Sequence, residues 1–186
     1  MTPRILSAAK QHEVFWLPNR KNSLRISRRQ ASTQVYFRLD TPCPNTSTMN
    51  RLELQALARD RLADSRALLR AHRYAGAYYL AGYSVECALK ACIARQVRRH
   101  DFPDKKVVSD SYTHDLTKLV GIAGLKTRLE SALASDRSFE LNWTVVRDWS
   151  EEDRYNSAIS RVEARDLYSA ITARRTGVMT WLRNYW

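Results

Sequence analysis

The segment from Arg73 to about Arg98 most constrains the fold, because it is small and apolar nearly all the way round a helical wheel. Its middle reads AYYLAGYSVECALKACIA. A helix that is apolar on every side must be surrounded by other elements, so this segment predicts the central helix of a packed bundle. Glu86 and Lys90 interrupt it at the i,i+4 spacing of a helical ion pair. We interpret them as a structural polar pair because an unpaired buried charge is costly; lining a pocket is the alternative.

Helical patterns also flank this central segment. Residues 51–70 carry an inward apolar stripe, and Asn50 and Glu53 have the spacing of a capping box. Thr113 is expected to cap a short helix, and another helical piece is expected at about residues 125–134. Only five glycines and five prolines occur in 186 residues, which disfavours a turn-dense sandwich or barrel. The sequence therefore predicts an all-α fold.

The last helix is expected to begin at Ser160, since Glu163 completes a second capping box. We expect it to continue towards the end of the chain, with an inner face formed by Leu167, Ile171, Val178, Leu182 and Tyr185. Before it, the acidic residues behind Ser150 suit the start of a short helix. Residues 98–106 are expected to form a polar connection interrupted by Pro103.

Residues 1–48 differ from the rest of the chain. They show no sustained helical or strand period and end in the turn-forming run DTPCPNTST. We expect them to be disordered, and the good helix start directly behind Met49 suggests that Met49 is the initiator and residues 1–48 a wrongly assigned upstream extension. The predicted domains are therefore 1–48, an extension, and 49–186, a helical domain.

The formal net charge of +12 is shared equally between these two parts. Residues 1–48 hold eight Lys/Arg against two Asp/Glu, so the helical domain has a charge of only +6 over nearly three times the length. A moderately basic domain permits contact with phosphates without demanding it.

The cysteines and the hydropathy pattern limit the other classes of site. Cys43, Cys87 and Cys92 contain no CxxC pair, so neither a disulfide framework nor a zinc site is indicated, and we interpret Cys87 and Cys92 as buried apolar residues. We expect no metal and no cofactor. No apolar stretch approaches a membrane span and no secretory leader is evident, so we expect a cytoplasmic protein that does not bind membranes.

Several of these segments together resemble a known family. They are GYSVECALK at residues 82–90, THDLTKL at residues 113–119, a segment with Trp and Arg-Tyr, and a final helix. The combination resembles HEPN-domain proteins over residues 49–186. The resemblance implies a bundle of four to five helices, usually a homodimer, found in bacterial toxin–antitoxin and defence systems beside nucleotidyltransferase partners. Many members of the family are metal-independent ribonucleases.

The ribonuclease members carry an arginine followed after four to six residues by a histidine, near the start of a late helix. The chemistry is clear, since neutral histidine can take the 2′-hydroxyl proton while arginine stabilises charge on the phosphate. This chain has no histidine after His114, so Arg154 and Arg161 lack a partner at that spacing. The literal matches are Arg66 with His72 and Arg95 with His100, both near the ends of the early helices. The candidate catalytic residues are therefore His114, His100 and Arg95.

The segment from Trp143 to Tyr155 is the strongest candidate for ligand binding. Its aromatic, cationic and acidic side chains could hold a nucleotide or an RNA strand, through Arg147, Trp149, Arg154 and Tyr155. A surface loop anchored by aromatics explains the same residues. The sequence leaves three hypotheses: a homodimeric module that binds RNA, a nucleotide or a nucleotidyltransferase-type antitoxin partner; an endoribonuclease with a relocated base; and a structural assembly factor.

Overall fold

A computed structural model describes residues 49–97 and 104–186, which belong to one unit of the chain, Pro44–Trp186. In this part of the chain all regular elements are helical and no strand occurs, which confirms the predicted all-α class. The predicted extension at residues 1–48, Cys43 and the candidate His100 lie outside the described residues.

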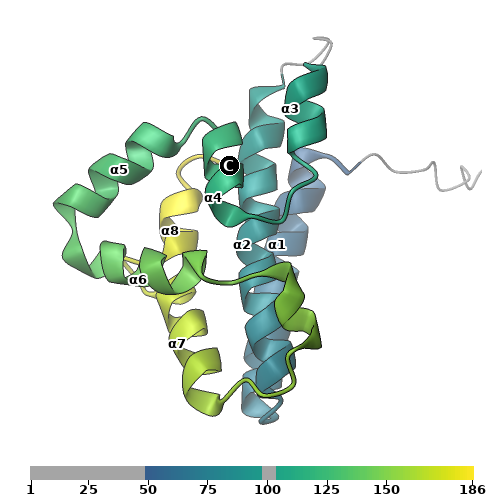
Figure 1. Cartoon of the computed structure of the whole chain (residues 1–186), viewed down its shortest axis with the longest axis vertical. Coiled ribbons are helices and arrows are strands. Elements are labelled where there is room, and N and C mark those ends of the chain that lie inside the picture. Colours follow the sequence, from purple (N-terminus) through teal and green to yellow (C-terminus); the bar gives the residue numbers. More distant parts are fainter. Residues whose placement is uncertain (1–48, 98–103) are drawn as a thin grey trace, which may run out of the picture. The chain divides into compact units, whose positions relative to one another are not determined.

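Eight α-helices and one short 3-10 helix make up the described residues (Figure 1). Their bounds are α1 Arg51–Arg70, α2 Tyr74–Gln96, α3 Lys105–Asp110, α4 Leu116–Ile122, α5 Lys126–Ser135, α6 Arg137–Arg147, η1 Glu151–Tyr155, α7 Arg161–Thr172 and α8 Val178–Leu182.

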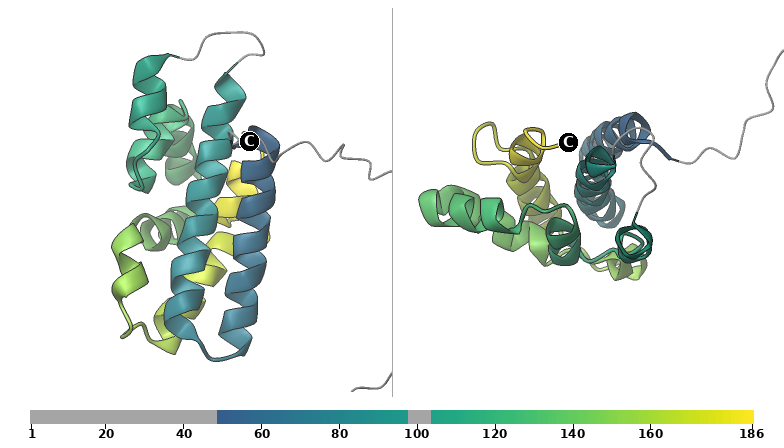
Figure 2. Two further views of the ribbon diagram at one scale, coloured as in Figure 1. Left: turned by 90° about the vertical axis from the view of Figure 1, so that its right-hand side faces the viewer. Right: turned by 90° about the horizontal axis from the view of Figure 1, so that it is seen from above.

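Helices α1 and α2 form an antiparallel hairpin, and the two lie side by side along most of their length (Figure 2). Small residues line their contact, because Ala58 of α1 and Ala77 and Ala81 of α2 are fully buried. The Ser65 hydroxyl donates a 2.7 Å hydrogen bond to the Ala77 carbonyl across the pair. The absence of bulk at these positions lets the two helix backbones approach closely.

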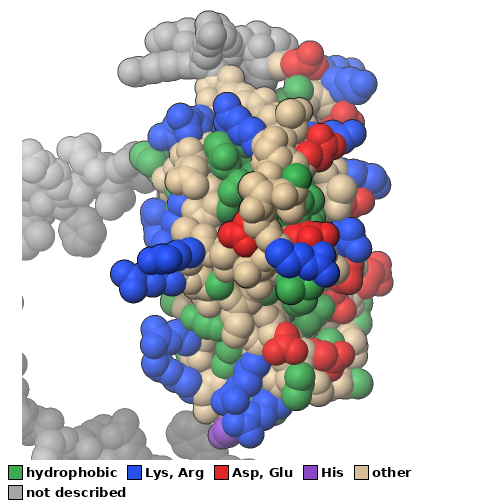
Figure 3. Space-filling view, turned by 90° about the vertical axis from the view of Figure 1, so that its left-hand side faces the viewer, with side chains coloured by type: hydrophobic (Ala, Val, Ile, Leu, Met, Phe, Trp, Pro, Cys, Tyr) green, Lys and Arg blue, Asp and Glu red, His purple; other side chains and the backbone are tan. Residues whose placement is uncertain are grey.

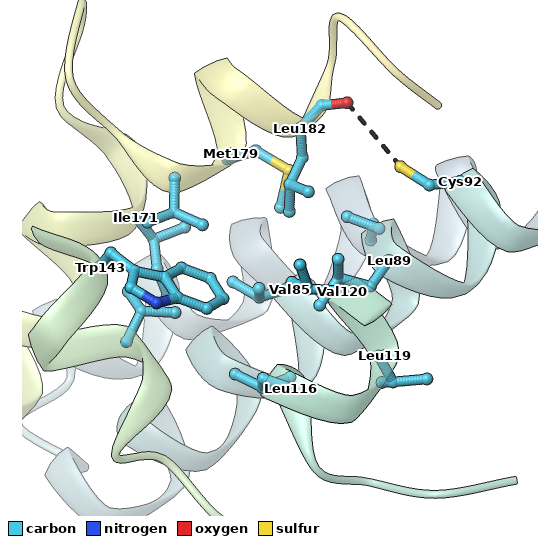
Figure 4. Packing of buried hydrophobic residues seen from close by; sticks show 14 of the residues in the cluster. Val85, Leu89, Cys92, Leu116, Leu119, Val120, Trp143, Ile171, Met179 and Leu182 are labelled. Atoms are coloured by element: carbon cyan, nitrogen blue, oxygen red, sulfur yellow. Dashed lines mark hydrogen bonds between the residues drawn. The ribbon is translucent and has the colours of Figure 1, made fainter. Parts of the chain in front are cut away.

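Helix α2 is the central element, as its composition predicts. It packs against α1, α4, α7, α8 and η1. Around it, apolar side chains from several helices meet in one core, which Figure 4 shows from close by for Val85, Leu89, Leu116, Leu119, Val120, Trp143, Ile171, Met179 and Leu182. The Cys92 thiol lies 3.9 Å from the Leu182 carbonyl oxygen, so the end of the chain closes over the C-terminal half of α2.

Capping side chains set three of the described helix starts, those of α1, η1 and α7, where the sequence predicts them. Asn50 with Glu53 and Ser160 with Glu163 both form complete capping boxes, at the starts of α1 and α7. Ser150 caps η1, and α5 covers the helical piece expected near residues 125–134. The predicted cap of α4 is wrong by two residues: the Asp115 carboxylate accepts from the Lys118 amide, whereas Thr113 Oγ1 accepts from the amide of Asp115.

The described residues hold more helices than the four or five expected. The connection predicted at residues 98–106 runs into α3, and the aromatic segment around Trp143 belongs to α6. The prediction of a single last helix is also wrong, because the helix is interrupted between α7 and α8. At the break an added Cβ on Gly177 would lie 2.4 Å from the Ala173 carbonyl oxygen, so only glycine fits against the end of α7.

The surface of the unit is charged unevenly. On the face shown in Figure 3, Asp and Glu side chains lie mostly towards one edge, where Lys and Arg side chains are interspersed with them, whereas the charged side chains along the opposite edge are mainly Lys and Arg. None of the described helices is both long enough and apolar enough to cross a membrane.

Candidate functional site

His114 lies between two carboxylates at the start of α4. Its Nδ1 is 3.0 Å from Glu86 Oε1 and 3.1 Å from Glu86 Oε2, and its Nε2 is 3.1 Å from Glu151 Oε2. Glu86 is on α2, and Glu151 is the first residue of η1. One imidazole therefore links three elements that are far apart in the sequence.

Glu86 is the anionic centre of this arrangement. Its side chain is 1% exposed, and it also accepts a 2.8 Å hydrogen bond from Lys90 Nζ one turn along α2. An ammonium group and an imidazole both bind this one buried carboxylate, and they satisfy the polar group that the sequence places in the middle of an apolar helix. Lys90 is 23% exposed and His114 is 42% exposed, so both partners reach water while Glu86 does not.

The position of η1 depends on Trp149, which precedes it. The indole is 3% exposed and packs directly on Gly82 of α2, with Tyr79 beside it at a centroid distance of 6.1 Å. The indole Nε1 is buried and has no hydrogen-bond partner among the residues the structure describes. The buried ring anchors the chain between α6 and η1, and this brings Glu151 to His114.

An open cavity of about 650 Å³ lies beside His114, and we call it the His114 cavity. It is walled by the start of α4 and by the chain from the end of α6 into η1, through His114, Asp115, Leu116, Thr117, Arg147, Asp148, Trp149, Ser150, Glu151 and Glu152. Part of the segment predicted to bind a ligand, residues 147–152, therefore lines the same cavity as the candidate base His114.

The four predicted ligand-binding residues are placed differently around it. Arg147 lines the cavity, and its Nε lies 3.3 Å from Asp148. Trp149 lies in the wall with its ring covered by Gly82. Arg154 and Tyr155 are on η1 beside the cavity, with Arg154 bound to Glu151 at 2.7 Å and stacked over the Tyr155 ring at 4.8 Å. Three of the four therefore have exposed side chains.

The two contacts of His114 limit its chemistry. An ionised carboxylate only accepts hydrogen bonds, so donating to both Glu86 and Glu151 requires a proton on each ring nitrogen, which only the cationic imidazolium has. In this arrangement the ring can act as a hydrogen-bond donor or a cation. To act as a base it would have to release Glu151, which Arg154 also holds.

Arg95, the other described catalytic candidate, is not part of this site. It is exposed near the end of α2, nine residues after Glu86, which is roughly 14 Å along the helix axis. It lines a different cavity. The structure therefore does not bring Arg95 and His114 together.

Cys87 and Cys92 are buried, and burial raises the pKa of the Cys87 thiol to about 11 and that of Cys92 to about 12. The usual value is 9.0. Because the folded values lie above it, the thiols stabilise the fold below about pH 9, and this contribution is lost as the pH rises through the folded values. Among the described residues no group of three or more His, Cys, Asp or Glu is arranged to hold a metal ion.

We expect both thiols to be unreactive in the native protein. In a Cys43→Ser background, iodoacetamide at about pH 8 should label neither Cys87 nor Cys92 until denaturant is added, because little thiolate forms and access is blocked. Mass spectrometry of the labelled chain measures this. Rapid native labelling of either cysteine would contradict the burial described above.

The sequence did not reveal that Glu86, His114 and Glu151 form one cluster. Glu86 and Lys90 are paired by helical spacing, but His114 is 28 residues further on and no local pattern links it to Glu86. Comparison of the chain with family models, curated proteins and solved structures finds no match in any of the three.

Proposed function

We propose that the chain is a HEPN-like helical binding module of the cytoplasm that engages an RNA strand or a nucleotide at the His114 cavity. The observation that carries this proposal is the cavity itself, where an imidazole, an arginine and several carboxylates surround a space of about 650 Å³. That volume is within the range of small-molecule sites.

The mixed charge of the cavity favours a ligand with both hydrogen-bond donors and an anionic group. Glu152 is exposed, and its carboxylate has no ion-pair partner among the described side chains, so it can accept from the amino or imino groups of a base. Arg147 can face a phosphate. A nucleotide unit combines these two chemistries, whereas a purely anionic ligand would be repelled by the acidic wall.

The arginines at the site can be released to a ligand at little cost. The pair of Arg147 with Asp148 is exposed on both sides, and such surface pairs are weak. In the pair of Arg154 with Glu151 the arginine is 43% exposed and the carboxylate 26%, so the guanidinium still reaches water. Tyr155 is 74% exposed, so its ring offers a surface on which a base can stack.

The resemblance to HEPN proteins extends the proposal to a homodimer and to a nucleotidyltransferase-type partner in a toxin–antitoxin or defence setting. It is supported by one contact: the two motifs that carry the resemblance, at residues 82–90 and 113–119, meet through Glu86 and His114. Through this contact, both motifs contribute a polar residue to the same site.

Binding of a fluorescent single-stranded RNA and of nucleotides tests the proposal. We expect Arg154→Ala and Tyr155→Ala each to weaken RNA binding about tenfold. Arg154→Ala should also make the slope of the logarithm of the binding constant against the logarithm of the salt concentration shallower by about 1, because one phosphate contact is lost. Arg174→Ala, an exposed arginine in the turn after α7, is the matched control and should bind like the wild type. The proposal of a binding module is contradicted if neither RNA nor nucleotides bind, or if both η1 variants bind them like the wild type. If the chain instead bound only the product of a neighbouring gene, we would assign it a structural role in assembly.

A metal-independent endoribonuclease is the second candidate, and the position of His114 on the cavity wall favours it. For catalysis one ring nitrogen must be free to take a proton, so a bound RNA would have to draw Glu151 and Arg154 away. A gel assay on structured and unstructured RNA, with chelator present, tests this. Cleavage that survives chelation and is lost in His114→Gln supports the enzyme, and intact RNA at every protein concentration excludes it.

A further inference from the structure

A second open cavity, of about 560 Å³, lies at the other end of the central helix. Its walls come from the last turns of α2, the link between α4 and α5, the first turn of α5 and the C-terminal residues. The lining residues are Cys92, Arg95, Gln96, Ala123, Gly124, Leu125, Arg128, Asn184 and Tyr185. We call it the Arg95–Arg128 cavity.

The charge of this cavity is opposite in character to that of the His114 cavity. Two arginines line it and no Asp or Glu is among its described lining residues. Neither Arg95 nor Arg128 forms an ion pair or a hydrogen bond with a described side chain, whereas Arg61, Arg137, Arg147 and Arg154 each have a carboxylate partner. Both guanidinium groups therefore keep their donors available.

The neighbouring groups reinforce this character. Arg128 lies over the Tyr185 ring at 5.0 Å, which holds the planar guanidinium by a cation–π contact and leaves its N–H edge free. Gln96 and Asn184 add side-chain amides to the wall. The ten-residue helix α5 also begins there, and its N-cap Leu125 supplies no side-chain acceptor, so the positive end of the helix adds to the field.

We propose that the Arg95–Arg128 cavity binds a phosphate group, carried by a nucleotide or by an RNA strand. Guanidinium groups bind phosphate through paired N–H donors, and a wall without carboxylates leaves that attraction unopposed. The site goes beyond the function proposed above, because it is a separate cavity on α2 and shares no lining residue with the His114 cavity. Either site can therefore fail its test without the other.

Titration calorimetry on the full chain tests the proposal with three probes: inorganic phosphate, adenosine monophosphate and a short single-stranded RNA with a 5′-phosphate. We expect at least one of them to bind the wild type, and the variant Arg95→Gln/Arg128→Gln to weaken that binding at least about tenfold. Both arginines are exposed, so the substitutions should leave the fold intact, which circular dichroism checks. Arg165→Gln, an exposed arginine on α7, is the control and should behave like the wild type.

The probes also identify the source of the phosphate. Binding of inorganic phosphate that the double variant loses supports a site for the phosphate group alone. Binding of the nucleotide or the RNA but not of phosphate, again lost in the double variant, supports the site and assigns its ligand. No binding of any probe at millimolar concentration, or binding that the double variant retains in full, overturns the proposal.

Discussion

Replacing Gly82 with alanine is expected to lower the free energy of unfolding by about 2–3 kcal/mol, although alanine is the better helix former by about 1 kcal/mol. A Cβ at this position would lie 2.2–2.3 Å from three ring atoms of Trp149. The ring is 3% exposed and enclosed by the core, so it cannot move aside without leaving its packing. The clash therefore outweighs the gain in helix propensity.

Urea unfolding of Gly82→Ala beside Gly121→Ala measures this effect. Gly121 is also helical, but an added Cβ there meets no atom within 4 Å, so its alanine variant should be more stable than the wild type by up to about 1 kcal/mol. Adding Trp149→Phe to Gly82→Ala should recover part of the loss, because the smaller ring leaves room. Equal stability of the two alanine variants would show that Trp149 does not pack on Gly82.

Gly82→Ala also tests whether the packing of Trp149 affects RNA binding. If the contact between Gly82 and Trp149 holds η1 in place, Gly82→Ala should weaken RNA binding at the His114 cavity even though Gly82 does not line it. The affinity should fall under conditions in which circular dichroism still shows a folded protein.

The double variant Lys90→Met/His114→Phe is expected to lose about 3–5 kcal/mol, because it leaves the carboxylate of Glu86 buried without either of its two hydrogen-bonding partners. Each single variant should cost much less, since one partner remains. The two effects should therefore be strongly non-additive in a double-mutant cycle.

Removing the charge itself supplies the control. Glu86→Leu in the double-variant background should recover most of the stability, because a buried ion cluster can be replaced by apolar groups with little loss. Glu86→Leu alone should cost less than the double variant, since Lys90 and His114 reach water. If the triple variant is no more stable than the double variant, the loss comes from altered packing and not from a stranded charge.

Local signals in the sequence predicted the bounds of α1 and the starts of α1 and α7 well. The predicted bounds of residues 51–70 coincide with α1, and the capping boxes at Asn50 and Ser160 are present. A capping box and an apolar period act within one or two turns of the same segment, so the residues that define them are neighbours in the chain.

The sequence did not predict helix α6 or the interruption between α7 and α8. In α6, Phe139, Trp143 and Val146 are buried at helical spacing behind the cap Asp136, whereas the sequence pattern from Trp143 onward also fits a loop anchored by aromatics. Between α7 and α8 the backbone leaves the helical conformation at Ala173, the C-cap of α7, and apolar periodicity does not report such a change.

The sequence by itself determined that α2 is the central helix, since a segment apolar on all sides must be enclosed, and that Glu86 and Lys90 lie one turn apart. Only the tertiary structure decided that Glu86 binds His114, that His114 also meets Glu151, and that Trp149 turns inward onto Gly82. The physical reason is range: helix periodicity and capping act between residues a few positions apart, whereas these contacts join α2, α4 and η1 and form only when the core packs.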